Sequence, residues 1–405
     1  MIYLFLFLLP IQLGTFFFIP ESYINGIRID YLAPAIYLTD LIAFALILFN
    51  IKKLLSILLS NIKKIPVLLL ILGVILNVSF AIEPLIALYR VVKILEVLAI
   101  FMIIKEWKAN SLHVLLAFLM GAAVQLGLMI FQVTQGHSMQ GLAYFLGERA
   151  FSLSTPAIAK VSLQGIEILR GYGTFPHPNA LAGFYLLLYT FFLYKKPPTI
   201  LPTNDYRPTT LTPLFLALCT LLILFSFSKI SMLGLVLVTS IYVLKEKYEC
   251  IICGISKMGI PLVLTLLVFA TQGDAESLEK RMYLAQSSLI IIKEHLLTGV
   301  GMGNYLYAQA AFPIPYKYVF LQPVHNIFLL MVTELGILPM VIGMYYAARN
   351  MLSKKFLIPN FSFLIILSVI VCTGMLDHYW LTIQQNILLL PVIFGLLQRH
   401  DRVVK

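Results

Sequence analysis

An all-α fold, a bundle of about twelve transmembrane helices, is predicted by the composition of the chain and by the recurrence of its apolar runs. Of 405 residues, 60% are hydrophobic and 12% are charged, which lies far outside the balance of a soluble domain. Only helices satisfy every backbone polar group of such runs within lipid. The predicted spans are residues 1–19, 34–50, 65–81, 84–104, 113–134, 178–194, 213–227, 231–244, 256–271, 324–346, 356–376 and 381–397. We therefore treat residues 1–405 as a single integral membrane domain.

Basic residues set the predicted orientation. Lys and Arg together are about twice as numerous in the loops that would be cytoplasmic as in the outer loops, which places both termini inside. The first run has no basic residue before it and no small-residue cleavage site, so we expect a retained helix and not a signal peptide. The net charge of +11 follows from the same bias, and no nucleic-acid partner is expected.

Two outer loops, residues 135–177 and 272–323, are long enough to hold structure, and loops on a rigid scaffold commonly carry function. In the second loop, one stripe at helical spacing predicts an amphipathic helix on the bundle or membrane surface. The stripe consists of Leu278, Met282, Ala285, Leu289 and Ile292. The glycines of Gly299-Val-Gly-Met-Gly303 then predict a tight turn, with a backbone nest for an anion as the alternative.

Arg170 and Arg281 are the leading cationic candidates on the outer side. A guanidinium presents a planar fork of donors that suits a phosphate or pyrophosphate, although an interfacial arginine can equally bind lipid head groups. His325 stands at the mouth of the tenth span, and a histidine there is either a general base or a hydrogen-bonded side chain. Asp377 and His378, at the outer end of the eleventh span, could supply its orienting partner.

Charged residues also occur within a predicted span. Arg90, Lys93 and Glu96 recur at three-residue spacing on one face of the fourth helix, and Asp40 lies at a similar depth in the second. Their positions allow an Asp40–Arg90 or Asp40–Lys93 pair, serving either a structural network or lipid-phosphate binding. The histidines have no metal-ligand spacing, and Cys250-Ile-Ile-Cys253 lacks a second ligand pair, so no metal site is expected.

The motifs resemble those of a known family. Arg170-Gly-Tyr-Gly-Thr-Phe-Pro-His-Pro-Asn179, followed by Ala180-Leu-Ala-Gly183, resembles the pattern R-x-x-G-T-F-x-x-P-N-x-x-A of the O-antigen ligase and O-antigen polymerase family. The second pattern of that family is similar to Arg281 with Thr298–Tyr305, Val324-His325-Asn326 and Glu334-Leu-Gly336. The ligase-like core would cover residues 165–345.

This resemblance implies a metal-independent, inverting membrane glycosyltransferase without a cofactor, which takes a glycan from undecaprenyl pyrophosphate. Arg170 and Arg281 would hold the pyrophosphate and stabilise its developing charge, and His325 would activate the acceptor hydroxyl. Asn179 and Asn326, which belong to the matching motifs, are further substrate-binding candidates together with Arg90 and Lys93.

Two positions depart from the family pattern. Lys229 stands where many members have arginine, and His177 lies within an altered form of the first motif, so neither receives a role.

Several functions remain open at this point. A ligase transfers the glycan to a lipid core, a polymerase transfers it to another lipid-linked repeat unit, and nothing in the sequence separates them. A protein O-glycosylating ligase usually brings added outer sequence that this chain lacks. A flippase or transporter of lipid-linked glycans predicts repeated halves and charges along a central path, and the sequence has no internal repeat. The expected location is the inner membrane, with the active site outside, in contact with membrane lipid.

Overall fold

The computed structural model describes residues 1–61, 65–194, 211–245, 275–312, 320–352 and 361–403. The predicted span 256–271, Cys250 and Cys253 lie outside these ranges. The described chain is mostly helical, which confirms the all-α class, whereas the twelve-helix membrane bundle stays a prediction.

The first half of the chain contains seven of its labelled α-helices and three small antiparallel two-stranded sheets, two of which are hairpins. The helices are α1 (Ile2–Leu8), α2 (Leu38–Phe49), α3 (Ile51–Asn61), α4 (Ile65–Ser79), α5 (Pro84–Glu106), α6 (Ser111–Gln135) and α7 (Pro178–Tyr194). The paired strands are β1 (Gly14–Phe16) with β4 (Ala35–Tyr37), β2 (Tyr23–Ile24) with β3 (Ile27–Arg28), and β5 (Lys160–Leu163) with β6 (Ile166–Leu169). Two 3-10 turns, η1 (Pro20–Ser22) and η2 (Gly141–Leu146), lie in the loops.

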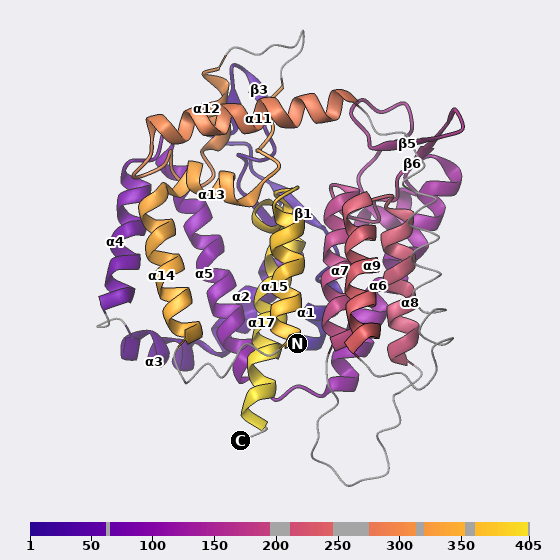
Figure 1. Ribbon diagram of the computed structural model, residues 1–405, viewed down its shortest axis with the longest axis horizontal. Helices are drawn as coiled ribbons and strands as arrows, with labels where there is room; N and C mark the ends of the chain where they lie inside the picture. Colours follow the sequence, from indigo (N-terminus) through magenta and orange to yellow (C-terminus); the bar gives the residue numbers. More distant parts are fainter. Residues whose placement is uncertain (62–64, 195–210, 246–274, 313–319, 353–360, 404–405) are drawn as a thin grey trace.

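The second half is helical throughout its described part. Its elements are α8 (Leu211–Phe225), α9 (Lys229–Lys245), α11 (Ala275–Glu294), α12 (Tyr305–Ala310), α13 (Ile327–Leu335), α14 (Ile337–Leu352), α15 (Phe361–Gly374), α16 (Tyr379–Thr382) and α17 (Gln384–Val403). Most of the long helices run side by side, while α11 lies across one end of the bundle (Figure 1). The hairpins and α13 lie toward that same end (Figure 1).

By length and apolar composition, one described helix, α6, is able to cross a membrane by itself. The pair Leu38–Phe49 and Ile51–Ser60 passes the same test together, with a bend of 73° between its halves. Several other apolar helices are shorter, including α7, α8 and α15.

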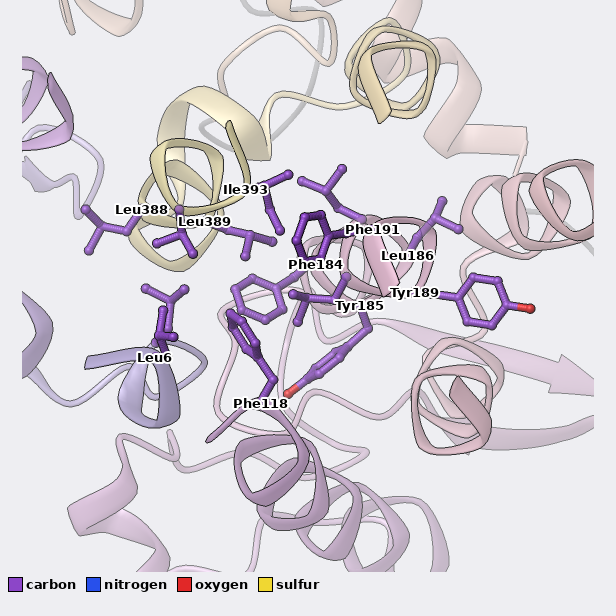
Figure 2. Packing of buried hydrophobic residues seen from close by; sticks show 14 of the residues in the cluster. Leu6, Phe118, Phe184, Tyr185, Leu186, Tyr189, Phe191, Leu388, Leu389 and Ile393 are labelled. Carbon is purple, nitrogen blue, oxygen red and sulfur yellow. The ribbon is translucent and has the colours of Figure 1, made fainter. Parts of the chain in front are cut away.

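Helix α7 lies at the centre of the main core. Nearly all of its residues are buried, as expected for a helix that is apolar on every side. Phe184 packs edge to face on Phe175 at 5.3 Å between ring centroids, and Figure 2 shows its neighbours from α6 and α17. Pro178 begins the helix, a position where the missing backbone N–H costs nothing. The first motif is therefore anchored to a helix that is buried on almost every side.

Two of the predicted spans need correction. The first span was predicted to reach residue 19, but α1 ends at Leu8 because Pro10 cannot continue a helix, and β1 follows. The tenth span is broken into α13 and α14 at Gly336, whose φ of +78° leaves the helical region.

The predicted helix of the second outer loop is confirmed as α11, but its apolar stripe faces outward. Leu278, Met282 and Leu289 are all more than half exposed. The face that packs on the protein contains Leu284 and Ser288 instead. Ser288 is tolerated there because its hydroxyl bonds the Leu284 carbonyl and lies 2.9 Å from the Tyr305 hydroxyl.

Candidate functional site

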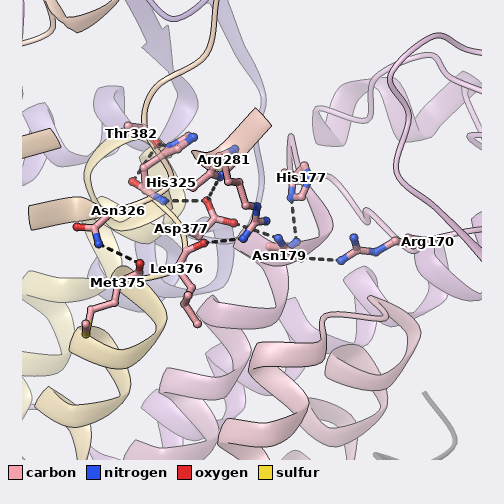
Figure 3. Close-up of polar contacts among 11 residues, drawn as sticks. Arg170, His177, Asn179, Arg281, His325, Asn326, Met375, Leu376, Asp377 and Thr382 are labelled. Atoms are coloured by element: carbon pink, nitrogen blue, oxygen red, sulfur yellow. Dashed lines mark hydrogen bonds and ion pairs between the residues drawn. The ribbon is translucent and has the colours of Figure 1, made fainter. Parts of the chain in front are cut away.

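Four segments far apart in the sequence meet at the α11 end of the bundle. Arg170 follows β6, Asn179 lies in the first turn of α7, Arg281 comes from α11, and His325 precedes α13. Asp377 joins them from the turn between α15 and α16 (Figure 3). These five residues are called the outer cluster below. Four of the seven residues predicted from sequence, namely Arg170, Asn179, Arg281 and His325, are thus brought together.

Arg170 is held on two sides by its own protein. Its Nε donates to the Ser226 carbonyl at 2.8 Å, and its Nη2 donates to Asn179 Oδ1 at 2.6 Å. Burial, with the positive charge of Arg281 nearby, lowers the pKa of Arg170 to about 10. The guanidinium stays charged at neutral pH and keeps donors that these two contacts do not use.

Asn179 connects the arginine to the aspartate. Its Oδ1 accepts from Arg170, while its Nδ2 donates to Asp377 Oδ2 at 3.0 Å. Its backbone N–H donates to Nδ1 of His177 at 3.2 Å. Asn179 thus orders the cluster, and direct contact with a substrate stays a prediction.

His325 and Asp377 form the closest acid–base pair of the cluster. Nδ1 of His325 lies 3.4 Å from Asp377 Oδ1, an ion-pair contact and not a well-formed hydrogen bond, and this nitrogen has no other partner. Asp377 is buried, with 7% of its side chain exposed. Burial alone would raise the pKa of Asp377, but His325 and His378 together hold that pKa well below its usual range. The carboxylate is therefore charged and directed at the imidazole.

Two further histidines and Arg281 surround this pair. The His378 ring lies 5.1 Å from the His325 ring, and its Nδ1 is 2.7 Å from Thr382 Oγ1. Burial lowers the pKa of His378 to about 4, and burial also lowers the pKa of His177. Both rings are neutral at neutral pH. Arg281 donates from Nη1 to the Leu376 carbonyl at 3.1 Å, which fixes its guanidinium beside Asp377.

Sequence reasoning gave Asp377 and His378 only a possible orienting role toward His325. The available signal was their place at the outer end of a span, opposite His325. The fold also assembles a ligand set that spacing did not predict, because side-chain atoms of His325, Asp377 and His378 all lie within 4.8 Å of one another. Two imidazoles and a carboxylate are able to hold a divalent cation, so metal independence is a hypothesis to be tested.

Asn326 lies next to His325 but has a structural task. Its Oδ1 accepts from the backbone N–H groups of Phe328 and Leu329 at 2.9 and 3.0 Å, which caps α13. Its Nδ2 donates to the Met375 carbonyl at 3.1 Å (Figure 3). Asn326 thus holds His325 at the helix entry, and a substrate contact by this residue stays a prediction.

Lys93 lies in a different network. It contacts Asp40 Oδ2 at 2.5 Å and Glu96 Oε2 at 3.6 Å, and Gln384 donates to the other oxygen of Asp40. All three charged side chains are nearly buried, with 12 to 13% exposed. The predicted Asp40–Lys93 pair is present. We call Asp40, Lys93, Glu96 and Gln384 the lysine network.

Arg90, on the same helix, is also engaged within the protein. Its Nη2 donates to the Tyr31 carbonyl at 2.8 Å, and its guanidinium lies 4.7 Å from the centre of the Tyr31 ring. The Tyr31 hydroxyl in turn donates to Glu334 at 3.0 Å. The assignment of Arg90 and Lys93 to a substrate stays a prediction.

The glycine-rich turn packs against the helices, and the backbone N–H groups of Gly303 and Tyr305 hydrogen-bond to the Glu334 carboxylate, so the protein itself supplies the anion. Its backbone N–H groups are used internally: Val300 donates to the Thr333 carbonyl, Gly301 to the Glu334 carbonyl, and Met302 to Asn77 Oδ1. Gly301 has a φ of +96°, and a Cβ there would lie 2.3 Å from that of Ala81. The predicted tight turn is confirmed.

Fold and site together define a mostly helical protein with a cationic, histidine-containing site at one end of its bundle. Residues 214–344 match the family model described as O-antigen ligase, which confirms the resemblance to the O-antigen ligase and polymerase family. The match includes Arg281 and His325 but ends before Asp377 and begins after Asn179. It supports a membrane protein with a ligase- or polymerase-type function in cell-surface polysaccharide biosynthesis. No curated protein matches the chain.

Proposed function

We propose that the outer cluster transfers a glycan from undecaprenyl pyrophosphate to an acceptor hydroxyl at the outer face of the cytoplasmic membrane, as an O-antigen ligase-like glycosyltransferase. The observation that carries this proposal is the convergence of two guanidinium groups with a histidine–aspartate pair. The family match over residues 214–344 supports the same class of chemistry.

Arg170 and Arg281 are proposed to bind the pyrophosphate of the donor. Both guanidinium groups are positioned by backbone carbonyls, Ser226 for the first and Leu376 for the second. Donors that are fixed before the reaction stabilise developing charge without further reorganisation. As the bond between the anomeric carbon and the phosphate oxygen breaks, the pyrophosphate leaves with the electron pair and its added charge faces these cations.

His325 is proposed to act as the general base. Because Asp377 faces Nδ1, the other ring nitrogen, Nε2, is the one that accepts the proton. The acceptor oxygen forms the new bond to the anomeric carbon, and its proton passes to Nε2. The imidazolium formed in this step is stabilised by the Asp377 carboxylate. Attack opposite the leaving pyrophosphate inverts the configuration at the anomeric carbon.

The proposal requires no metal, since the leaving group is already anionic and stable and two cations receive its charge. The acceptor is a lipid-core sugar in a ligase and a second lipid-linked repeat unit in a polymerase. Both reactions use the same three roles of pyrophosphate binding, proton removal and acceptor binding.

Deletion of the gene in its host, followed by electrophoresis of the surface glycans, tests the function. Loss of long glycan from the core, with accumulation of free lipid-linked chains, is expected for a ligase. Core capped by single repeats identifies a polymerase. An unchanged ladder would contradict both, and restoration by the wild-type gene is the control.

A further inference from the structure

The first outer loop holds three apolar side chains away from the protein. Leu142, Tyr144 and Phe145 of η2 are 86%, 62% and 66% exposed, and the two rings contact each other edge to face at 5.7 Å. The whole turn Gly141–Leu146 contains no charged residue. These three side chains are called the η2 patch.

A buried carboxylate fixes the loop that carries the patch. Glu148, 2% exposed, accepts through Oε1 from the Met139 backbone N–H at 2.9 Å and through Oε2 from the Gln140 backbone N–H at 2.6 Å. Oε1 also accepts from Gln132 on the last turn of α6 at 2.8 Å. A carboxylate that is desolvated and accepts three hydrogen bonds gives the loop a defined shape.

The backbone of the loop is strained at Gln140 and admits only glycine at position 147. Gln140 has a φ of +60°, outside the usual range for a residue with a side chain. Gly147 has a φ of +83°, and a Cβ there would lie 2.4 Å from the backbone of Gln12 and Leu13. Strain of this kind persists only where the surroundings enforce it. The loop is thus built, against strain, to present the η2 patch outward.

The position of the patch favours a lipid surface. Gln132 ties the loop to the end of α6, the helix that is long enough to cross a membrane. Gln132 also donates to the Gly173 carbonyl, which places the patch at the same end of the bundle as the outer cluster. The patch therefore lies just beyond the last turn of α6, near the level where a bilayer around that helix would meet water.

The composition and size of the patch agree with this position. Tyrosine is enriched where hydrocarbon meets head groups, and Arg149, which follows the patch in the chain, is exposed although its Nη2 donates to the Pro176 carbonyl at 2.6 Å, and its charge suits anionic lipid. Three partly exposed side chains offer roughly 400 Å², about half of what each partner contributes to a stable protein interface. A second copy of the chain is therefore the weaker candidate.

We propose that the turn Gly141–Leu146 docks into the interface of the lipid bilayer, with Leu142, Tyr144 and Phe145 inserted among the head groups and upper acyl chains. This proposal does not depend on the proposed glycan transfer.

Tryptophan fluorescence in vesicles tests the docking. Tyr144→Trp and, separately, Phe145→Trp are reconstituted into phosphatidylethanolamine and phosphatidylglycerol vesicles that contain lipid with a doxyl quencher at C5 or at C12. The parent chain, which contains Trp107 and Trp380, supplies the spectrum to subtract. Ser154→Trp, at an exposed polar position of the same loop, is the matched control.

The expected result is emission at shorter wavelength for both patch variants, with more loss of intensity from the C5 quencher than from C12. The Ser154→Trp signal should stay water-like and largely unquenched. Water-like, unquenched emission from both patch variants would overturn the proposal. So would quenching equal to that of the control, or a blue shift that depends on the protein-to-lipid ratio, since the latter indicates contact between copies.

Discussion

The outer cluster and the lysine network both contain charged residues from distant segments, but the two differ in how completely those charges are paired within the protein. In the lysine network, Lys93 is shared between two carboxylates, a glutamine satisfies the remaining oxygen of Asp40, and Oε1 of Glu96 is the carboxylate oxygen left without a hydrogen bond. In the outer cluster, each arginine is held by a carbonyl and keeps free donors, and His325 Nδ1 lacks a proper hydrogen bond. A network that is internally paired stabilises a fold, whereas one with unused donors and acceptors is suited to bind a ligand.

The largest expected effect follows from removal of the proposed base. His325→Ala should lower the rate of glycan transfer by roughly 10²–10⁴-fold, as for a lost general base, and leave the protein inserted in the membrane. The assay is transfer of glycan from lipid-linked donor by the reconstituted protein. His295→Ala, at an exposed position after α11, is the matched control, and undiminished transfer by His325→Ala would remove this residue from the mechanism.

The lysine network should respond in stability more than in rate. Lys93→Met leaves Asp40 and Glu96 without their cation, and loss of one partner of a buried pair costs about 3–5 kcal/mol of unfolding free energy. Denaturant unfolding in detergent measures this cost.

Two variants control the lysine experiment. Lys53→Met breaks an exposed pair with Glu106, also at 3.6 Å, and should cost less than about 1 kcal/mol. The double variant Lys93→Met with Asp40→Leu should recover part of the loss. Transfer that disappears in a fully stable double variant would contradict the structural role and favour lipid-phosphate binding.

A substitution that keeps the positive charge of Arg281 but removes its planar set of donors distinguishes shape-specific binding of the pyrophosphate from attraction by charge alone. Arg281→Lys should lower transfer by roughly tenfold or more, because lysine offers a point charge to the pyrophosphate. The same assay applies, with Arg28→Lys as control, since Arg28 is well exposed and pairs only loosely with Asp30 at 3.6 Å. Equal activity of both variants would show that Arg281 acts only through its charge.

The buried histidines beside the outer cluster, His378 and His177, predict a pH dependence of stability. His378 has a lowered pKa, about 4 in the folded protein, so the unfolded chain binds more protons between that value and its ordinary pKa of about 6.5. Its contribution to stability is complete above the higher value and is lost as the pH falls through this window. The slope from one such group is at most about 1.4 kcal/mol per pH unit.

His378→Gln should therefore flatten the dependence of unfolding free energy on pH across this window, measured by denaturant unfolding at a series of pH values. A residual slope from His177 is expected, because its pKa shifts in the same direction. An unchanged slope in the variant would show that the ring titrates alike in both states.

The smallest expected effect is that of a chelator. Treatment with EDTA should leave transfer unchanged, because the two arginines already receive the charge of the leaving pyrophosphate. If EDTA abolished transfer and an added divalent cation restored it, His325, Asp377 and His378 would instead be assigned as metal ligands.

Much of the local structure could be predicted because apolar periodicity and helix breakers act over short distances. The span predicted to begin at residue 178 begins there as α7, at Pro178. The helix predicted over residues 1–19 was too long, because Pro10 breaks the helix and α1 ends at Leu8. The amphipathic helix predicted in the second outer loop is present as α11, and only the fold decided that its apolar stripe faces outward while Leu284 and Ser288 pack on the protein.

The sequence by itself determined the helical class, the resemblance to O-antigen ligases and the identity of Arg170, Arg281 and His325 as chemically notable residues. These properties follow from composition and from motifs, which depend on residue type and near neighbours. Only the tertiary structure decided that Asn179 joins Arg170 to Asp377, that Asp377 faces His325, and that Lys93 belongs to a separate, paired network. Such contacts depend on how helices distant in the chain pack together, and that packing is a property of the whole core.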